Sequence, residues 1–235
     1  MENSIYIAED EEKILETVQT FLESEGYRVR GFDNGDALFA AFLEEPCDLV
    51  ILDVLMPGST GFQITKKIRE ISTVPIIILT ARDSELDYAT GINLGSDDYF
   101  TKPFSAMSLV MRVKALFRRV RLDRQELQEG RKGEGGELLF GDLRVNRRTK
   151  EVWTGRGEAL PLTPTEYNVL LYLLENRDRA VSRDELLDKV WGYGKDVETR
   201  ACDDTVRRLR KKLEDTQVRV ETVWGFGFIL KEAHP

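Results

Sequence analysis

The chain has 235 residues, of which 41% are hydrophobic, and its formal net charge is −8 at pH 7. This length suits one large domain or two ordinary ones, and the composition is normal for a globular protein. No run approaches the roughly 18 apolar residues of a membrane span, and the first residues do not form a signal peptide. The two cysteines, Cys47 and Cys202, lack metal-ligand spacing. We therefore expect a cytoplasmic protein with reduced thiols and no membrane contact.

The negative charge is confined to the first half of the chain. Residues 1–120 carry 12 Lys and Arg against 20 Asp and Glu, whereas residues 121–235 carry 22 of each. The neutral second half contains a basic run from Arg207 to Lys212. Because a local basic patch decides whether a surface attracts nucleic acid, the overall acidity does not exclude DNA binding by the second half.

The first half alternates short apolar strands with amphipathic helices. The pattern predicts strands at 4–8, 27–32, 49–53, 74–80 and 98–102. It predicts helices over 14–22, 36–43, 62–71, 84–94 and 109–120. Five such alternations indicate a doubly wound parallel α/β domain with a five-stranded sheet.

One strand is the most informative stretch of this half. An apolar run rich in Val, Ile and Leu ends on Asp53, and Pro57-Gly58 then forms a turn. Such a run is typical of a strand buried on both faces of a parallel sheet, and open α/β sheets place ligands at the carboxyl ends of their strands. The alternative is an aspartate that only caps the next helix, and the other strand ends decide against it.

Polar side chains also end the other strands. Glu9 and Asp10 follow the first strand, Thr80 ends the fourth and Lys102 ends the fifth. Clustered carboxylates repel one another, and a hard cation such as Mg²⁺ relieves that repulsion. Asp53 could then attack a phosphoryl group while Lys102 and Thr80 contact its oxygens. Each residue alone is ordinary, but their joint occurrence after successive strands predicts a phosphoryl-transfer site.

Residues 4–120 resemble the receiver domain of two-component response regulators. The matching pieces are Glu9-Asp10, Asp53 with Met56-Pro57-Gly58, Thr80-Ala81 and Asp97 to Phe104. The resemblance implies that Asp53 is the phosphoacceptor and that Mg²⁺ is held by Glu9 or Asp10, Asp53 and the Leu55 carbonyl. It also implies that Thr80 and Tyr99 form a switch pair, that Lys102 contacts the phosphoryl group, and that the Lys102-Pro103 bond is cis.

Members of this family often dimerise on phosphorylation through charges on the fourth and fifth helices. The candidates here are Asp97, Asp98, Arg112, Lys114 and Arg119. Uncharged residues stand at three positions where the family often has charges: Tyr88, Asn93 and Ser108. The only histidine, His234, lies at the C-terminus, so the phosphoryl donor is expected to be a partner sensor histidine kinase or a small acyl phosphate.

A glycine-rich polar segment over 122–137 predicts a flexible linker between a domain at 1–121 and one at 138–235. The second domain begins with an antiparallel sheet over 138–160. Thr163-Pro164-Thr165-Glu166 opens a helix to about 176, and Ser182 to Glu185 opens another that ends at Trp191. A third helix over 199–213 and a hairpin over 220–230 complete the order of an α+β winged helix-turn-helix.

The third helix has an apolar stripe of Cys202, Val206, Leu209 and Leu213. This spacing predicts an opposite, charged face of Arg200, Asp204, Arg207, Arg208 and Lys211. The second half resembles the DNA-binding domain of OmpR/PhoB-type regulators, on the basis of 162–167, 186–192, 206–213 and 222–228. A charged face that is merely solvated is the alternative.

The resemblance places the third helix in the major groove of promoter double-stranded DNA. Arg208 is our candidate for a guanine edge, with Arg200 and Thr205 also directed at the groove. Phosphate contacts are expected from Arg210, Lys211 and Lys212, and Arg207 is a further DNA-binding candidate. Two positions depart from the family: Asp204 replaces a usual apolar residue, and Trp224 stands where many members have an arginine. We therefore expect the wing, with Thr222 and Trp224, to contact sugar or backbone and not to read the minor groove by charge.

These patterns together predict a phosphorylation-dependent transcriptional regulator that forms a homodimer, with RNA polymerase as a further candidate partner. The protein is not expected to be a turnover enzyme, apart from slow autodephosphorylation. One alternative is a phosphotransferase that uses Asp53 as its nucleophile, but enzymes of the haloacid-dehalogenase type want a second aspartate where this chain has Leu55. The other is a scaffold or constitutive DNA binder that is never phosphorylated, and the retained Thr80 and Lys102 speak against it.

Overall fold

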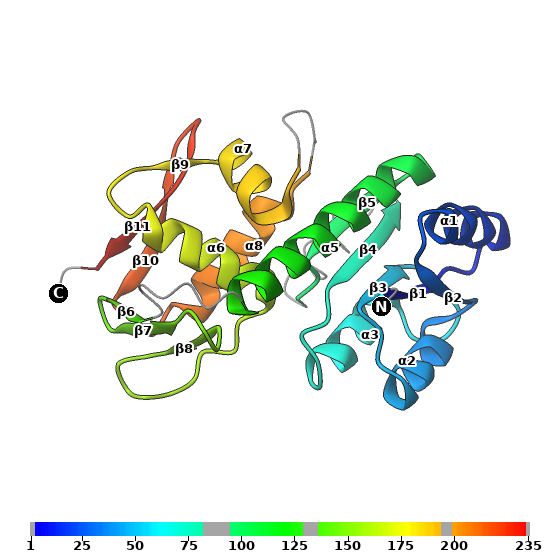
Figure 1. The fold of residues 1–235 in the computed structure, drawn as a ribbon, viewed down its shortest axis with the longest axis horizontal. Helices are drawn as coiled ribbons and strands as arrows, with labels where there is room; N and C mark the ends of the chain where they lie inside the picture. The colour runs from blue at the N-terminus through cyan, green and yellow to red at the C-terminus, as the bar shows by residue number, and fades with distance from the viewer. Residues whose placement is uncertain (1–2, 82–94, 129–135, 194–198, 234–235) are drawn as a thin grey trace. The chain divides into compact units, whose positions relative to one another are not determined.

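A computed structural model describes residues 3–81, 95–128, 136–193 and 199–233, without the side chains of 81 and 119–128. The chain divides into two compact units, Met1–Lys114 and Ala115–Pro235, which Figure 1 shows as ribbons. The helix predicted over 84–94 lies outside the described residues.

The first unit contains a five-stranded sheet in the order β2-β1-β3-β4-β5. All of its strand pairs are parallel, which confirms the predicted architecture. The strands are β1 (Ser4–Ala8), β2 (Arg28–Phe32), β3 (Leu49–Asp53), β4 (Ile76–Ala81) and β5 (Asp98–Lys102). The chain leaves β1 toward β2 on one side and returns to β3 on the other. Ligands of such sheets bind at this reversal of strand order.

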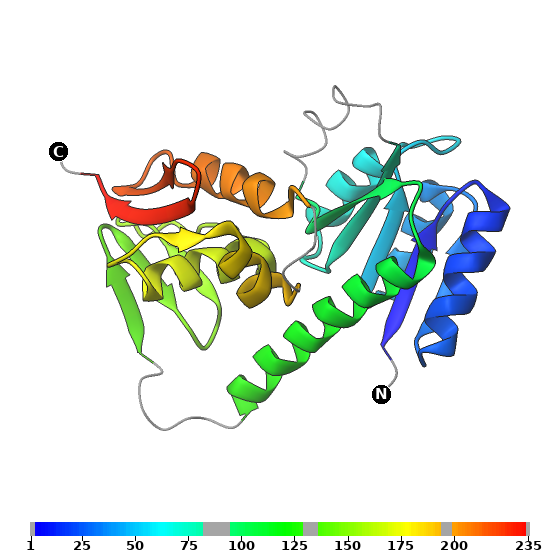
Figure 2. The same ribbon diagram turned by 90° about the horizontal axis from the view of Figure 1, so that it is seen from above.

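Helices cover both faces of this sheet. They are α1 (Glu12–Ser24), α2 (Gly35–Glu44), α3 (Gly61–Arg69) and α5 (Ala106–Gln128). Figure 2 shows α3 and α5 on opposite sides of the strands. Alternate strand residues such as Val50 and Leu52 join the α2–α3 core. On the other face, Lys114 of α5 lies 2.6 Å from Glu25 at the end of α1.

The sequence explains where α3 begins. Thr60 caps the helix by accepting a hydrogen bond from the Gln63 backbone, and the Gln63 side chain accepts one from the Thr60 backbone in return. Gly61 then lies against the end of β3, because a Cβ atom at this position would be only 2.1 Å from the Asp53 carbonyl oxygen. The helix can therefore start directly beside Asp53 only with glycine here.

Helix α5 is longer than predicted. It continues to Gln128, so the start of the segment expected to be a flexible linker is helical. Residues 122–128 lack glycine and consist mainly of Arg, Leu, Asp, Gln and Glu, most of which have good helix propensity. The glycines begin only at Gly130. The prediction applied their effect to the whole of 122–137 and therefore ended the helix too early.

Beyond the end of α5, the described part of the second unit contains two small sheets and three helical segments. The first sheet is antiparallel and contains β6 (Glu137–Phe140), β7 (Leu143–Asn146) and β8 (Glu151–Trp153). The second has the order β10-β11-β9 and contains β9 (Val181–Ser182), β10 (Val218–Val223) and β11 (Gly227–Glu232). The sequence pattern missed β9, which is only two residues long.

The helices of this unit are close to those predicted. They are α6 (Pro164–Glu175), α7 (Arg183–Leu186) with a π-helical turn at Leu187–Trp191, and α8 (Ala201–Lys212). Thr163 and Ser182 cap α6 and α7 as expected. The fold is therefore a winged helix-turn-helix. The stripe of Cys202, Val206, Leu209 and Leu213 lies in its core.

Both cysteines are buried core residues. Cys47 packs in the first unit and Cys202 in the second. Burial raises the pKa of each thiol to about 12. At neutral pH both side chains therefore remain protonated and act as small apolar groups.

Gly61→Ala is expected to destabilise the first unit by about 1–3 kcal/mol, since the added methyl group overlaps the Asp53 carbonyl and the helix must shift. Urea unfolding measures the change. Gly136→Ala is the control, because no atom lies within 4 Å of its Cβ position. Equal stability of the Gly61 variant and the wild type would show that α3 can move away from β3 at little cost.

Candidate functional site

Four of the predicted polar residues meet at the carboxyl edge of the parallel sheet. Glu9 follows β1, Asp53 ends β3, Thr80 is in β4 and Lys102 ends β5. The strand register pairs Asp53 with Leu79, directly before Thr80, and Ala81 with Lys102. Glu9, Asp53 and Thr80 are buried. These positions surround the reversal of strand order between β1 and β3, as the sequence predicted.

Lys102 joins the two buried carboxylates. Its Nζ lies 2.7 Å from Oε2 of Glu9 and 3.1 Å from Oδ1 of Asp53. The same ammonium donates a hydrogen bond of 2.8 Å to Oε1 of Glu9. The Lys102-Pro103 peptide is cis, as the resemblance implied. One cation thus neutralises part of the negative charge at this edge.

Burial leaves this charge only partly compensated. Desolvation raises the pKa of Glu9, and repulsion from Asp53 raises it further. The hydrogen bond from Lys102 opposes both effects. Desolvation also raises the pKa of Asp53, while the attraction of Lys102 opposes it. Burial alone would lower the pKa of Lys102, but its bonds to the two carboxylates outweigh that effect and raise it. An added cation at this edge would therefore bind favourably.

The carboxylates suit a divalent metal ion. Glu9, Asp10 and Asp53 each offer an oxygen, and these oxygens lie within 4.8 Å of one another. Asp10 is exposed, so its carboxylate could bind a Mg²⁺ ion that keeps several of its water molecules. Leu55, whose carbonyl is the fourth predicted ligand, follows Asp53 by two residues and has an exposed side chain.

Tyr99, the predicted switch partner of Thr80, is buried.

A second set of contacts fixes the loop that follows Asp53. Asp36 of α2 accepts hydrogen bonds from the Ser59 backbone at 2.9 Å and the Ser59 hydroxyl at 2.7 Å. Lys67 of α3 donates to the same carboxylate at 3.1 Å. The bonds from Ser59 lower the pKa of Asp36 to about 2, with a further contribution from Lys67. No local sequence pattern indicates these contacts among Asp36, Ser59 and Lys67, because the three residues come from two helices and a loop.

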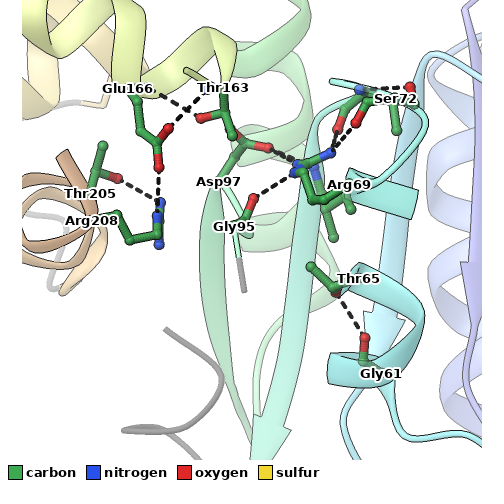
Figure 3. Close-up of polar contacts among 12 residues, drawn as sticks. Gly61, Thr65, Arg69, Ser72, Gly95, Asp97, Thr163, Glu166, Thr205 and Arg208 are labelled. Carbon is green, nitrogen blue, oxygen red and sulfur yellow. Dashed lines mark hydrogen bonds and ion pairs between the residues drawn. The ribbon is translucent and has the colours of Figure 1, made fainter. Parts of the chain in front are cut away.

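The expected dimer residues mostly contact their own unit. Asp97 binds Arg69 at 2.8 Å and accepts a hydrogen bond from the Ile76 backbone, as Figure 3 shows in part. Asp98 binds Arg112 at 2.7 Å. Both aspartates are buried, so the expectation that they lie ready on an exposed charged face is wrong. Lys114 pairs with Glu25, and the side chain of Arg119 lies outside the described residues.

The face of α8 also differs from the prediction. Arg208 is only 4% exposed, and its Nε lies 3.1 Å from Oε1 of Glu166 in α6. Figure 3 shows this contact together with the hydrogen bond from Arg208 to Thr205. Asp204 and Thr205 are buried as well. The prediction that Arg208, Thr205 and Asp204 face a DNA groove is therefore wrong.

Glu166 has two functions at this contact. It completes the capping box of α6 with Thr163, and it also binds Lys212 of α8 at 2.6 Å. Since its side chain is fully buried, the two cations compensate a charge that would otherwise be costly. The pairing fixes how α8 is rotated about its axis.

The exposed side of α8 retains several cations. Arg200, Arg207 and Lys211 are exposed, whereas Arg210 is half-buried. Arg210 donates 2.6 Å and 2.8 Å hydrogen bonds to the Val220 carbonyl and the Thr222 hydroxyl of β10. Arg200, at the N-cap, is seven residues before Arg207, which is four before Lys211, so the three exposed cations lie along one side of the helix. At the tip of the β10–β11 hairpin, Trp224 is exposed.

Comparison with known families identifies both halves. A family model described as "Response regulator receiver domain" matches residues 5–114. Another, described as "Transcriptional regulatory protein, C terminal", matches residues 157–230. Within the part of the chain that the structure describes, no helix has the length and apolar character needed to cross a membrane.

Individual relatives match along nearly the whole length. The transcriptional regulatory protein CseB of Streptomyces coelicolor is 40% identical over 231 residues, which cover 97% of each chain. The uncharacterized transcriptional regulatory protein YclJ of Bacillus subtilis is 37% identical over 97% of this chain and 99% of its own. Among solved structures, a cysteine-to-serine variant of RitR has a TM-score of 0.75 at 25% identity, and the match covers 98% of this chain and 99% of that one.

Asp53→Asn is expected to raise the melting temperature of the protein without divalent cations. A carboxyl whose folded pKa is raised contributes stability below its unfolded pKa and loses it as the pH rises through the folded value. At pH 7 the ionised Asp53 therefore costs stability, which asparagine removes. Mg²⁺ at ten times its Kd should stabilise the wild type by about 1.4 kcal/mol and the variant by less. Calorimetry with EDTA and with Mg²⁺ tests both effects, with exposed Glu16→Gln as the control, and a lower melting temperature of the variant in EDTA would contradict the first.

Arg208→Ala is expected to lower the free energy of unfolding by about 3 kcal/mol, because it removes one partner of a buried ion pair. The exposed neighbour Arg207→Ala should change it by about 0.5 kcal/mol or less. Urea unfolding of both variants provides the comparison. If the two variants were equally stable, the Glu166–Arg208 pair would not be what holds α8 against α6.

Proposed function

The chain belongs to the two-component response regulators that join a receiver domain to a DNA-binding domain, and from this membership we propose that Asp53 is its phosphoacceptor. The observation that carries the proposal is the position of Asp53 at the sheet edge, 3.1 Å from the Lys102 ammonium and within reach of Glu9 and Asp10. Transcriptional regulation is the activity of the family.

The chemistry requires a carboxylate nucleophile and compensation of charge. One oxygen of Asp53 would form a bond to phosphorus as the bond to the donor's leaving group breaks, which produces an aspartyl phosphate. The Lys102 ammonium and the Thr80 hydroxyl would contact the phosphoryl oxygens. Bound at Glu9, Asp10, Asp53 and the Leu55 carbonyl, Mg²⁺ would neutralise negative charge on the transferring group.

The same residues supply a switch. Lys102 now binds both oxygens of Glu9, and a phosphoryl group on Asp53 would compete for this ammonium. Thr80 and Tyr99 lie on neighbouring strands, so a movement of Thr80 toward the new group would alter the packing around Tyr99. A phosphoryl group can shift the protein between two states only if it interacts differently with them. The contacts to Thr80 and Lys102 would provide that difference.

We propose that the phosphorylated protein forms a homodimer on DNA. Asp97 and Asp98 are buried in ion pairs with Arg69 and Arg112. The charged candidates for the interface are therefore Lys114, whose side chain is 40% exposed although it pairs with Glu25, and Arg119. Major-groove and phosphate contacts are assigned to the exposed cations of α8, namely Arg200, Arg207 and Lys211. Arg210, Lys212 and Thr222 support the structure around them.

The partners follow from these roles. A sensor histidine kinase would supply the phosphoryl group, since the single histidine of the chain is His234 at its end. Promoter DNA is the target of the second unit, and RNA polymerase is a candidate partner once the protein is bound there. Access to both the kinase and the promoter would require a cytoplasmic protein.

Incubation with acetyl phosphate and Mg²⁺ should add one phosphoryl group to the wild type and none to Asp53→Asn. Intact-mass spectrometry measures the addition, and hydroxylamine should remove it because acyl phosphates are reactive toward nucleophiles. Asp48→Asn is a matched control, since Asp48 directly precedes the opposite end of the same strand. Equal labelling of the Asp53 and Asp48 variants would refute the assignment of the acceptor.

A further inference from the structure

The loop between β3 and α3 is held differently in its two halves. In the first half, the Val54 backbone donates a 3.0 Å hydrogen bond to the Leu79 carbonyl, and the Val54 carbonyl accepts one of 3.1 Å from the Gly61 backbone. Val54 and Met56 are both buried in the core of the unit, and exposed Leu55 lies between them. The direction of the Leu55 carbonyl therefore depends on how the whole loop is held.

The second half of the loop is supported from helix α2. Pro57 and Gly58 are exposed, and Gly58 has a φ of +83°. A Cβ atom on Gly58 would be only 2.7 Å from Oδ2 of Asp36, so this carboxylate lies directly against the loop backbone. The same oxygen accepts a 2.9 Å hydrogen bond from the Ser59 backbone. A bond of this kind, with an ionised acceptor, is stronger than one between neutral groups.

The carboxylate of Asp36 is itself fixed in place. Its Oδ1 accepts hydrogen bonds from the Ser59 hydroxyl at 2.7 Å and from Lys67 of α3 at 3.1 Å. The Lys67 ammonium also donates to the Ser59 hydroxyl at 3.2 Å and lies 5.6 Å from the ring centre of Phe39 in α2. Because the pKa of Asp36 is lowered to about 2, the carboxylate stays ionised at neutral pH. These contacts therefore persist under physiological conditions.

We propose that Asp36 is a positioning residue for divalent-cation binding at Glu9, Asp10 and Asp53. By holding the second half of the loop, it would keep the Leu55 carbonyl directed at the ion. The inference rests on the Mg²⁺ site of the proposed function and adds to it a residue of another helix that does not contact the ion. Removal of a group that orients a metal ligand commonly lowers metal affinity about 10- to 100-fold.

The affinity for Mg²⁺ tests the proposal directly. Titration calorimetry with the full-length protein, first treated with EDTA and then dialysed, should show that Asp36→Ala raises the Kd for Mg²⁺ about tenfold. Asp36→Asn should raise it less, because an amide oxygen can still accept the bond from the Ser59 backbone. Ser59→Ala should have a smaller effect again, since it retains that backbone bond. Urea unfolding checks that each variant is fully folded under the titration conditions.

Two further variants separate position from charge. Loss of a negative charge could by itself weaken the binding of a cation. Lys67→Met removes a positive charge from the same contacts, so it should tighten Mg²⁺ binding if charge is the cause and weaken it slightly if position is. Glu44→Ala is the matched control, because it removes the charge of an exposed carboxylate in the last turn of α2, and it should leave the Kd unchanged.

The rate of phosphorylation by acetyl phosphate supplies a second measurement. Asp36→Ala should need more Mg²⁺ than the wild type to reach half of its maximal rate. At saturating Mg²⁺ the two rates should be equal, since Asp53, Thr80 and Lys102 are unchanged. A residue that only stabilised the fold would alter neither the Kd nor this dependence in a fully folded protein.

Distinct outcomes would overturn the inference. If Asp36→Ala bound Mg²⁺ as tightly as the wild type, the proposed function would stand and the role of Asp36 would be wrong. Tighter binding by Lys67→Met would assign the effect to charge. A maximal rate that stayed low at saturating Mg²⁺, with an unchanged Kd, would mean that Asp36 acts on the acceptor and not on the ion. If the wild type bound no Mg²⁺, the metal site of the proposed function would itself fail.

Discussion

Like charges at the carboxyl edge of the parallel sheet are the constraint on which the first unit depends. The fold brings Glu9 and Asp53 together in a buried position, where desolvation raises the pKa of both carboxyl groups. Lys102, at the end of β5, reduces this repulsion: its Nζ lies 2.7 Å from Glu9 and 3.1 Å from Asp53. The site is therefore held in balance by one flexible side chain. A phosphoryl group or cation at this edge would compete for the partners of Lys102, and under the proposed function this competition would change the structure.

A comparable constraint shapes the second unit. The fully buried Glu166 requires cations, and α8 provides Arg208 and Lys212. Because these two residues are committed to the interior, the helix can present only its other basic residues outward. The same α8 contributes Arg210 to the support of the hairpin. Helix α8 and the β10–β11 hairpin are thus positioned by the interior contacts of residues that the sequence pattern would assign to the surface.

The sequence was sufficient wherever the signal was local. Apolar runs that ended on Asp53, Thr80 and Lys102 located the strands and their common edge, since parallel strands align such ends. The capping residues Thr163 and Ser182 located the starts of α6 and α7, because a cap lies directly before the helix that it begins. Arg208 was misplaced because its partner, Glu166, lies 42 residues away, and helical periodicity cannot reveal such a pairing. Asp97 and Asp98 were misjudged likewise: their arginine partners come from α3 and α5.

The burial of both cysteines has a consequence for the signals to which the protein can respond. Oxidants attack the thiolate, not the thiol. Burial raises the pKa of Cys47 and Cys202 to about 12, so both thiols stay protonated at pH 7. Neither sulfur is exposed to a peroxide or a disulfide partner. The two cysteines therefore offer no reactive thiolate through which an oxidant could act directly on the protein.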